Sequence, residues 1–151
     1  MNRYSVTGLT TATAATNAVG IATLWNPSTA KSIFIVGIKV YKTIATVDVH
    51  ALARISVRGT AAATVTPDID NDYDHGLAPV SGALLDVGAY SGALTALTPS
   101  LESIYLPAAI GSGYNIVFPK AIQVKQSAGF GIITGAAVIG QPCNVTFIWD
   151  E

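Results

Sequence analysis

Alternation of apolar and polar residues with a period of two is the feature that most constrains this fold. It is clearest over residues 49–58, where Val49, Ile55 and Val57 share one face with two alanines. Mostly polar residues, including His50, occupy the other face. Successive side chains of a strand point to opposite faces, so this pattern indicates a half-buried strand.

A second stretch of this kind, residues 31–42, differs at its start. Phe34, Val36, Ile38 and Val40 share one face, but the opposite face also begins with isoleucines and becomes polar only later. A strand that is apolar on both faces is covered on both faces. We therefore expect the start of this strand to lie between a second sheet and another element.

Short strands punctuated by Gly and Pro run through most of the chain, and no stretch indicates a helix. This pattern favours a sandwich or a barrel. We predict an all-β sandwich in a single domain over residues 1–151. The expected strands cover residues 18–25, 31–42, 49–58, 103–106, 114–118, 122–126, 130–134 and 144–149. The expected core contains Phe34, Val36, Ile38, Val40, Ile55, Val57, Val124, Phe147 and Trp149.

One long stretch, from Pro67 to Pro99, interrupts this rhythm of strands. Loops longer than about 15 residues are uncommon in compact domains and tend to be functional or held by a partner. We predict an ordered excursion that lies on a surface. Its acidic run, Asp68 to Asp74, lacks the glycine and glutamate of an EF-hand calcium loop, so we interpret the run as a solvated loop.

The shortage of charged side chains bears on how the chain is used. Charged residues make up 11% of the sequence, against about 25% in an ordinary soluble protein. So few charges do not cover the surface of a lone monomer, and we expect part of it to be buried against other subunits. The net charge of −1 gives no field that attracts nucleic acid or anionic lipid. The charge-free stretch 126–149 is broken by glycines and a proline, which excludes a membrane-spanning helix.

No constellation of catalytic or metal-ligating residues emerges from the sequence. His50 is expected on the outer face of a strand and His75 in the long excursion, an arrangement that does not make a zinc site. No Gly-x-Ser-x-Gly motif accompanies any serine. Cys143, the only cysteine, forms no intrachain disulfide and is interpreted as a small apolar core residue. We expect no enzymatic activity, no cofactor and no metal.

Six stretches distributed over most of the chain carry a resemblance to a known family. They are residues 3–8 (RYSVTG), 24–28 (LWNPS), 54–60 (RISVRGT), 64–68 (TVTPD), 106–113 (LPAAIGSG) and 145–151 (VTFIWDE). Together they resemble small virion proteins of tailed bacteriophages, of the capsid decoration or cement type.

The resemblance implies a jelly-roll β-sandwich that forms a homotrimer. Proteins of this type lie on the outer surface of an icosahedral shell and lock neighbouring copies of the major capsid protein together. The low charge content agrees with such a role, because a trimer on a shell removes subunit surface from water on two sides.

The N-terminal segment, about residues 1–17, is expected to be a short extended arm. It precedes the first expected strand across a stretch rich in Thr and Ala, and it has little reason to become ordered alone. We predict that Arg3, Tyr4 and Val6 contact the capsid. Deletion of residues 2–9 is then expected to leave a folded trimer that no longer coats shells.

A trimeric receptor- or carbohydrate-binding module of a phage tail fibre is the alternative, since it shares the β-sandwich and the trimer. Such a module is expected to gather exposed aromatic residues near carboxylates or amides. The aromatic residues here make up only 8% of the chain and are well spread. A jelly-roll enzyme of the cupin type needs a cluster of histidines, which two separated histidines do not supply.

Overall fold

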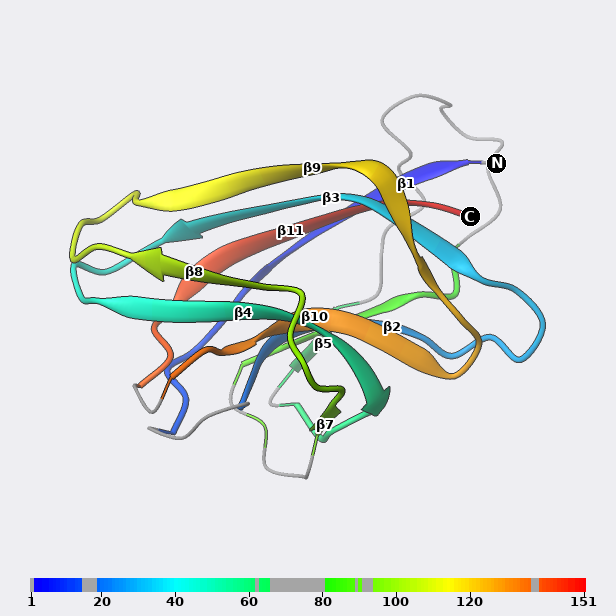
Figure 1. Cartoon of the computed structure of the whole chain (residues 1–151), viewed down its shortest axis with the longest axis horizontal. Coiled ribbons are helices and arrows are strands. Elements are labelled where there is room, and N and C mark those ends of the chain that lie inside the picture. Colours follow the sequence, from blue (N-terminus) through cyan, green and yellow to red (C-terminus); the bar gives the residue numbers. More distant parts are fainter. Residues whose placement is uncertain are drawn as a thin grey trace.

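The structure is a computed structural model that describes residues 2–14, 19–61, 63–65, 81–88, 90, 94–136 and 139–151. All regular elements in these ranges are strands, and they form two antiparallel sheets that lie one over the other (Figure 1). This confirms the expected all-β fold, with two sheets packed as in a β-sandwich.

The smaller sheet has four strands and contains both ends of the described chain. Its order is β1 (Arg3–Leu9), β11 (Cys143–Asp150), β3 (Ile33–Lys42) and β9 (Gly113–Val124). The central position of β11 follows from its pattern of alternate burial, in which four side chains face the other sheet: Cys143, Val145, Phe147 and Trp149.

The larger sheet has seven strands, and one of its edges is shared by two short strands. Its order is β5 (Ala63–Val65), β6 (Leu84–Val87), β2 (Gly20–Asn26), β10 (Ala128–Thr134) and β4 (Asp48–Val57). The free edge of β4 then pairs with β8 (Glu102–Leu106) along its first half and with β7 (Thr95–Ala96) near its end.

A β-bulge in β3 changes the face that this strand buries. The β3 partners of both β11 and β9 skip Val36. Before the bulge Ile33 and Ile35 point into the core, and after it Ile38 and Val40 do so. The extra residue breaks the period of two. The predicted core positions Ile38 and Val40 are therefore confirmed, whereas Phe34 and Val36 are wrong because they lie half-buried on the outer face.

Strand β4 also turns the opposite face to the other sheet from the one expected. Asp48, His50 and Leu52 face the four-stranded sheet, while Ile55 belongs to a second apolar cluster on the outer side of β4. Leu94 and Ala96 of the following excursion pack against this second cluster. Ile55 is therefore buried as predicted, but residues of the excursion cover it and the second sheet does not.

Of the remaining residues predicted for the core, three are buried and one is exposed. Val124, Phe147 and Trp149 are fully buried, as expected. Val57 is 50% exposed, so its assignment to the core is wrong. It is the last residue of β4 and lies beyond Ile55, the last residue of this strand that pairs with β10.

The expected N-terminal arm is instead a strand of the sandwich. Residues 3–9 form β1, which pairs with β11 from Arg3 opposite Asp150 to Leu9 opposite Asn144. Tyr4 is 2% exposed and stacks on Trp149, with ring centroids 5.7 Å apart. Tyr4, Val6 and Gly8 alternate along β1 and form the face that points into the core.

The long excursion between β4 and β8 is described in part. Strand β6 lies beside β2, and an ion pair ties it to the end of β4: Arg58 donates to both carboxylate oxygens of Asp86 at 2.7 Å. Thr64 of β5 donates to the same carboxylate. The acidic run Asp68 to Asp74 and His75 lie outside the described residues.

Candidate interaction surface at the uncharged end

Four segments far apart in the sequence meet at one end of the sandwich. They are residues 9–14, 43–47, 105–112 and 139–144, and none of them contains Asp, Glu, Lys or Arg. We call this surface the uncharged end. Two of its loops, 43–47 and 107–112, form the left extremity of the molecule in Figure 1.

Backbone hydrogen bonds join these segments to one another. Thr10 N donates to Cys143 O at 2.9 Å, and Thr43 N donates to Pro142 O at 3.1 Å. Lys42, at the end of β3, exchanges backbone bonds with the 107–112 loop, since Gly111 N donates to its carbonyl and its own N–H donates to Ser112 O. Hydrogen bonds therefore hold these loops in place relative to one another.

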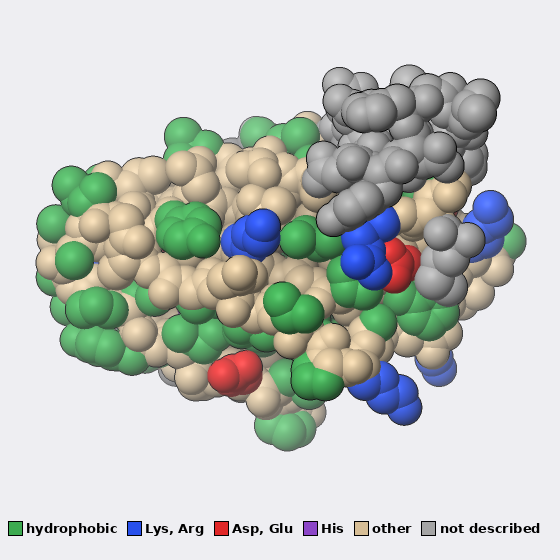
Figure 2. All heavy atoms as spheres, turned by 90° about the horizontal axis from the view of Figure 1, so that it is seen from above, with side chains coloured by type: hydrophobic (Ala, Val, Ile, Leu, Met, Phe, Trp, Pro, Cys, Tyr) green, Lys and Arg blue, Asp and Glu red, His purple; other side chains and the backbone are tan. Residues whose placement is uncertain are grey.

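The uncharged end exposes large apolar side chains. Ile110 is 71% exposed and Tyr105 is 65% exposed, and Leu9, Val47 and Ile139 are also open to solvent. Hydrophobic side chains gather at the left end of the molecule in Figure 2, where no acidic or basic side chain is visible. Large exposed apolar side chains that gather at one end of a molecule indicate an interaction site.

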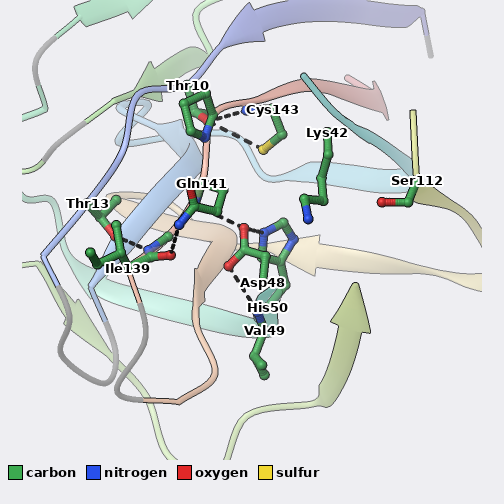
Figure 3. Close-up of polar contacts among 12 residues, drawn as sticks. Thr10, Thr13, Lys42, Asp48, Val49, His50, Ser112, Ile139, Gln141 and Cys143 are labelled. Atoms are coloured by element: carbon green, nitrogen blue, oxygen red, sulfur yellow. Dashed lines mark hydrogen bonds and ion pairs between the residues drawn. The ribbon is translucent and has the colours of Figure 1, made fainter. Parts of the chain in front are cut away.

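A buried polar cluster lies directly beneath this surface (Figure 3). Its centre is the pair Asp48 and His50, both with fully buried side chains, joined by a 2.8 Å contact between Asp48 Oδ2 and His50 Nε2. The carboxylate accepts, so His50 Nε2 carries a proton. On the other side of the ring His50 Nδ1 lies 3.1 Å from the hydroxyl of Tyr114 on β9.

The same carboxylate holds the backbone of a loop. Asp48 Oδ2 accepts from Gln141 N at 3.0 Å, and Asp48 Oδ1 accepts from Val49 N at 2.9 Å. Asp48 thus connects β4 to the 139–144 segment. A buried carboxylate needs such donors because an unpartnered charge is costly in the interior.

Lys42 is a second buried polar group of this cluster, only 2% exposed. Its Nζ donates to Pro107 O at 2.9 Å, and the Ser112 hydroxyl donates to the same carbonyl at 3.1 Å. The ammonium therefore fixes the start of the loop that carries Ile110. A positive charge is present here without being exposed at the surface.

Cys143 closes the cluster on the side of β1. Its Sγ lies 3.3 Å from Thr10 Oγ1, and Cys143 N donates to that hydroxyl at 3.0 Å. Burial raises the pKa of the Cys143 thiol to about 11. Burial also raises the pKa of Tyr114 well above its ordinary value. Both groups stay protonated near neutral pH, and Cys143 is a structural thiol.

The polar cluster acts by holding backbone segments in position. Asp48, His50 and Tyr114 form a chain of hydrogen bonds, but the carboxylate and the imidazole have no exposed surface through which to reach a substrate. What the cluster does is hold three loops at fixed positions. Within the described residues no group of three or more His, Cys, Asp or Glu side chains is placed to hold a metal ion.

The residues predicted to contact a capsid are not brought together at the uncharged end. Arg3 lies at the opposite end of β1 and pairs with Asp150 through contacts of 2.8 and 3.0 Å. It borders a shallow groove of about 420 Å³ on the outer face of the four-stranded sheet, which Lys39 and Val117 also line. Tyr4 and Val6 are core residues, so of the three only Arg3 offers its side chain to a partner.

The uncharged end itself was missed at the level of the sequence. Its signal was present in the long charge-free stretches, such as residues 126–149. What the sequence does not show is that the turns in these stretches meet at one place.

Comparison with known proteins gave no match: no protein-family model, curated protein sequence or solved structure is significantly similar to this chain. Among the residues described, the structure contains no helix with the length and apolar character needed to cross a membrane.

Proposed function

We propose that the sandwich is a jelly roll. The support is the pairing of eight strands, with the short strands β5, β6 and β7, which lie between β4 and β8 in the sequence, set aside. The first strand pairs with the last, β1 with β11, and the next pairs follow inward: β2 with β10, β3 with β9 and β4 with β8. Such a ribbon of four antiparallel pairs becomes a sandwich when β11 joins β3 and β10 joins β4. Jelly rolls of eight strands are common in viral capsid proteins.

We further propose that this chain is a structural virion protein that decorates and stabilises an icosahedral phage capsid and carries out no reaction. The observation that carries this function is the uncharged end. Its exposed apolar side chains rest on a hydrogen-bonded support, an arrangement suited to a permanent contact between protein chains such as the assembly on a shell requires. The protein acts as a homotrimer on the outer surface of the shell, where it bridges copies of the major capsid protein.

The mechanism is binding itself. A protein that binds only the assembled shell stabilises that state by mass action. Three linked subunits convert several weak contacts into one strong attachment. No active site is needed, and the buried Asp48 and His50 serve only to shape the surface.

Binding to shells tests this function. The purified protein is mixed with mature phage shells from which minor proteins have been removed, and the shells are then sedimented and heated. We expect saturable co-sedimentation and a higher temperature of shell disruption. A protein that binds no shell and instead binds host-envelope glycans would overturn the proposal in favour of a tail-fibre module.

A further inference from the structure

We infer that the uncharged end is the surface through which copies of this chain meet, with Ile110 beside the symmetry axis of the oligomer. The inference rests on the proposed function only for the existence of a homotrimer. It adds the identity of the contact surface and its occupant, which is a second copy of the same chain.

The argument begins with what symmetry does to charge. In a rotationally symmetric contact, a side chain close to the axis faces the same side chain of the neighbouring copies. A charge at that place meets a like charge and is repelled, whichever its sign. A contact with a different protein has no such restriction, because opposite charges can face each other across it. A surface that lacks both signs over four separate segments fits contact with itself.

The apolar character of the surface points the same way. Contacts between identical subunits are more apolar than those between different proteins. Ile110, Tyr105 and Val47 supply exposed apolar area at the uncharged end. The bonds from Lys42 Nζ and Ser112 Oγ to Pro107 O fix the loop of Ile110 before any contact forms, which lowers the entropic cost of association.

The opposite end of the sandwich has the complementary property. The start of β1, the end of β11 and the turns that follow β2, β4 and β9 lie there (Figure 1), and these segments contain Arg3, Asp150, Lys31, Arg58 and Lys125. Contact between copies through the uncharged end leaves the opposite end of the molecule uncovered, where it can face another protein. The two ends of the molecule thereby serve two partners.

Charge substitution at a matched pair of positions tests the inference. Ile110 and Val117 are 71% and 73% exposed, but Val117 lies on the outer face of the four-stranded sheet. We expect Ile110→Glu and Ile110→Lys each to convert the oligomer to monomers at micromolar concentration, measured by light scattering. Val117→Glu is expected to keep the wild-type mass. Circular dichroism and thermal unfolding verify that all three variants are folded.

Mixing the two Ile110 variants provides the decisive measurement. If copies meet at Ile110, an equal mixture of I110E and I110K regains part of the oligomeric mass. A mixed trimer has two pairs of opposite charges and one pair of like charges at the axis, whereas a trimer of either single variant has three pairs of like charges. No recovery on mixing overturns the inference, as does an oligomer that survives both single substitutions.

Binding to shells separates this inference from the proposed function. Ile110 variants that remain oligomeric but no longer bind shells show that the uncharged end faces the capsid, which overturns the inference and leaves decoration intact. A wild-type protein that is oligomeric through Ile110 but binds no shell supports the inference and overturns decoration.

Discussion

At the scale of single residues, the buried carboxylate of Asp48 is the group on which the uncharged end depends. It accepts from His50 Nε2, Gln141 N and Val49 N. We predict that Asp48→Ala lowers the free energy of unfolding by about 3 kcal/mol or more, since each buried donor left without a partner costs about 1–3 kcal/mol. Urea denaturation measures this loss.

Asp150→Ala is the matched control for that substitution. Asp150 also accepts hydrogen bonds from a side chain, but that partner, Arg3, is 47% exposed. Exposed ion pairs contribute at most about 1 kcal/mol, so the control is expected to lose little stability. Equal losses in the two variants would contradict a central role of the buried cluster.

The Cys143 thiol gives a prediction of pH dependence. Its pKa rises from the ordinary 9.0 to about 11 on folding because of burial. Between these values the folded protein keeps a proton that the unfolded chain has released, so stability is full below pH 9 and falls as the pH rises toward 11. The loss amounts to about 3 kcal/mol for this group.

Urea midpoints at pH 8 and pH 10.5 measure this effect. Cys143→Ala is expected to be less stable than the wild type at pH 8 but to lose less stability on going to pH 10.5. Tyr114 contributes in the same direction, because burial raises its pKa too. An identical pH dependence of both proteins would show that Cys143 does not carry the effect.

Which side chains are buried was predictable from the sequence on strands whose apolar face packs on the other sheet. It was not predictable on the other strands. Phe147 and Trp149 alternate regularly on a central strand, and both are buried as expected. His50 appeared as an exposed residue because its face of the strand also holds Arg54. A buried histidine is stable only with partners such as Asp48 and Tyr114, and the distant Tyr114 is not visible as a partner in the sequence.

At the scale of elements, β1 gives the sharpest test. We predict that deletion of residues 2–9 prevents folding and does not yield a folded trimer, because the deletion removes the buried side chains of Tyr4 and Val6 and the ladder that covers one edge of β11. Far-ultraviolet circular dichroism and the loss of cooperative unfolding measure the outcome. Arg3→Ala, which leaves the strand in place, is the control and is expected to fold.

The existence of most strands was predictable, but their irregularities were not. A bulge at Val36 inverts the face of β3, and β9 continues through Pro119, which was expected to separate two strands. In the ladder with β3, residues 118–121 of β9 are skipped, so the missing N–H of the proline costs no bond there. Neither feature changes the local composition, which is why alternation alone does not reveal them.

At the scale of the whole molecule, the separation of charged and uncharged ends predicts how association responds to salt. An apolar contact between copies is not screened by ions, whereas contacts made through exposed charges weaken as the ionic strength rises. We predict that the oligomeric mass stays constant between 0.05 and about 0.5 M NaCl, while shell binding weakens over this range. Light scattering and co-sedimentation measure the two quantities separately.

An oligomer that dissociates in high salt would contradict the assignment of the uncharged end to contacts between copies. Sodium sulfate offers a second check, because excluded salts strengthen apolar association. The mass of the wild-type protein is then expected to be retained at lower protein concentration.

The arrangement of the four-stranded sheet also has a consequence for biosynthesis. Strand β11 lies between β1 and β3, yet it is the last of the four to be synthesised. Until it emerges from the ribosome, β1 has no neighbour to pair with, and the edge of β3 that β11 later joins is open. The sheet therefore closes only after translation has passed β11, and pairing of such distant segments is slow. Unpaired strand edges make an incompletely folded chain prone to aggregation, so this interval is when the chain is most exposed to it.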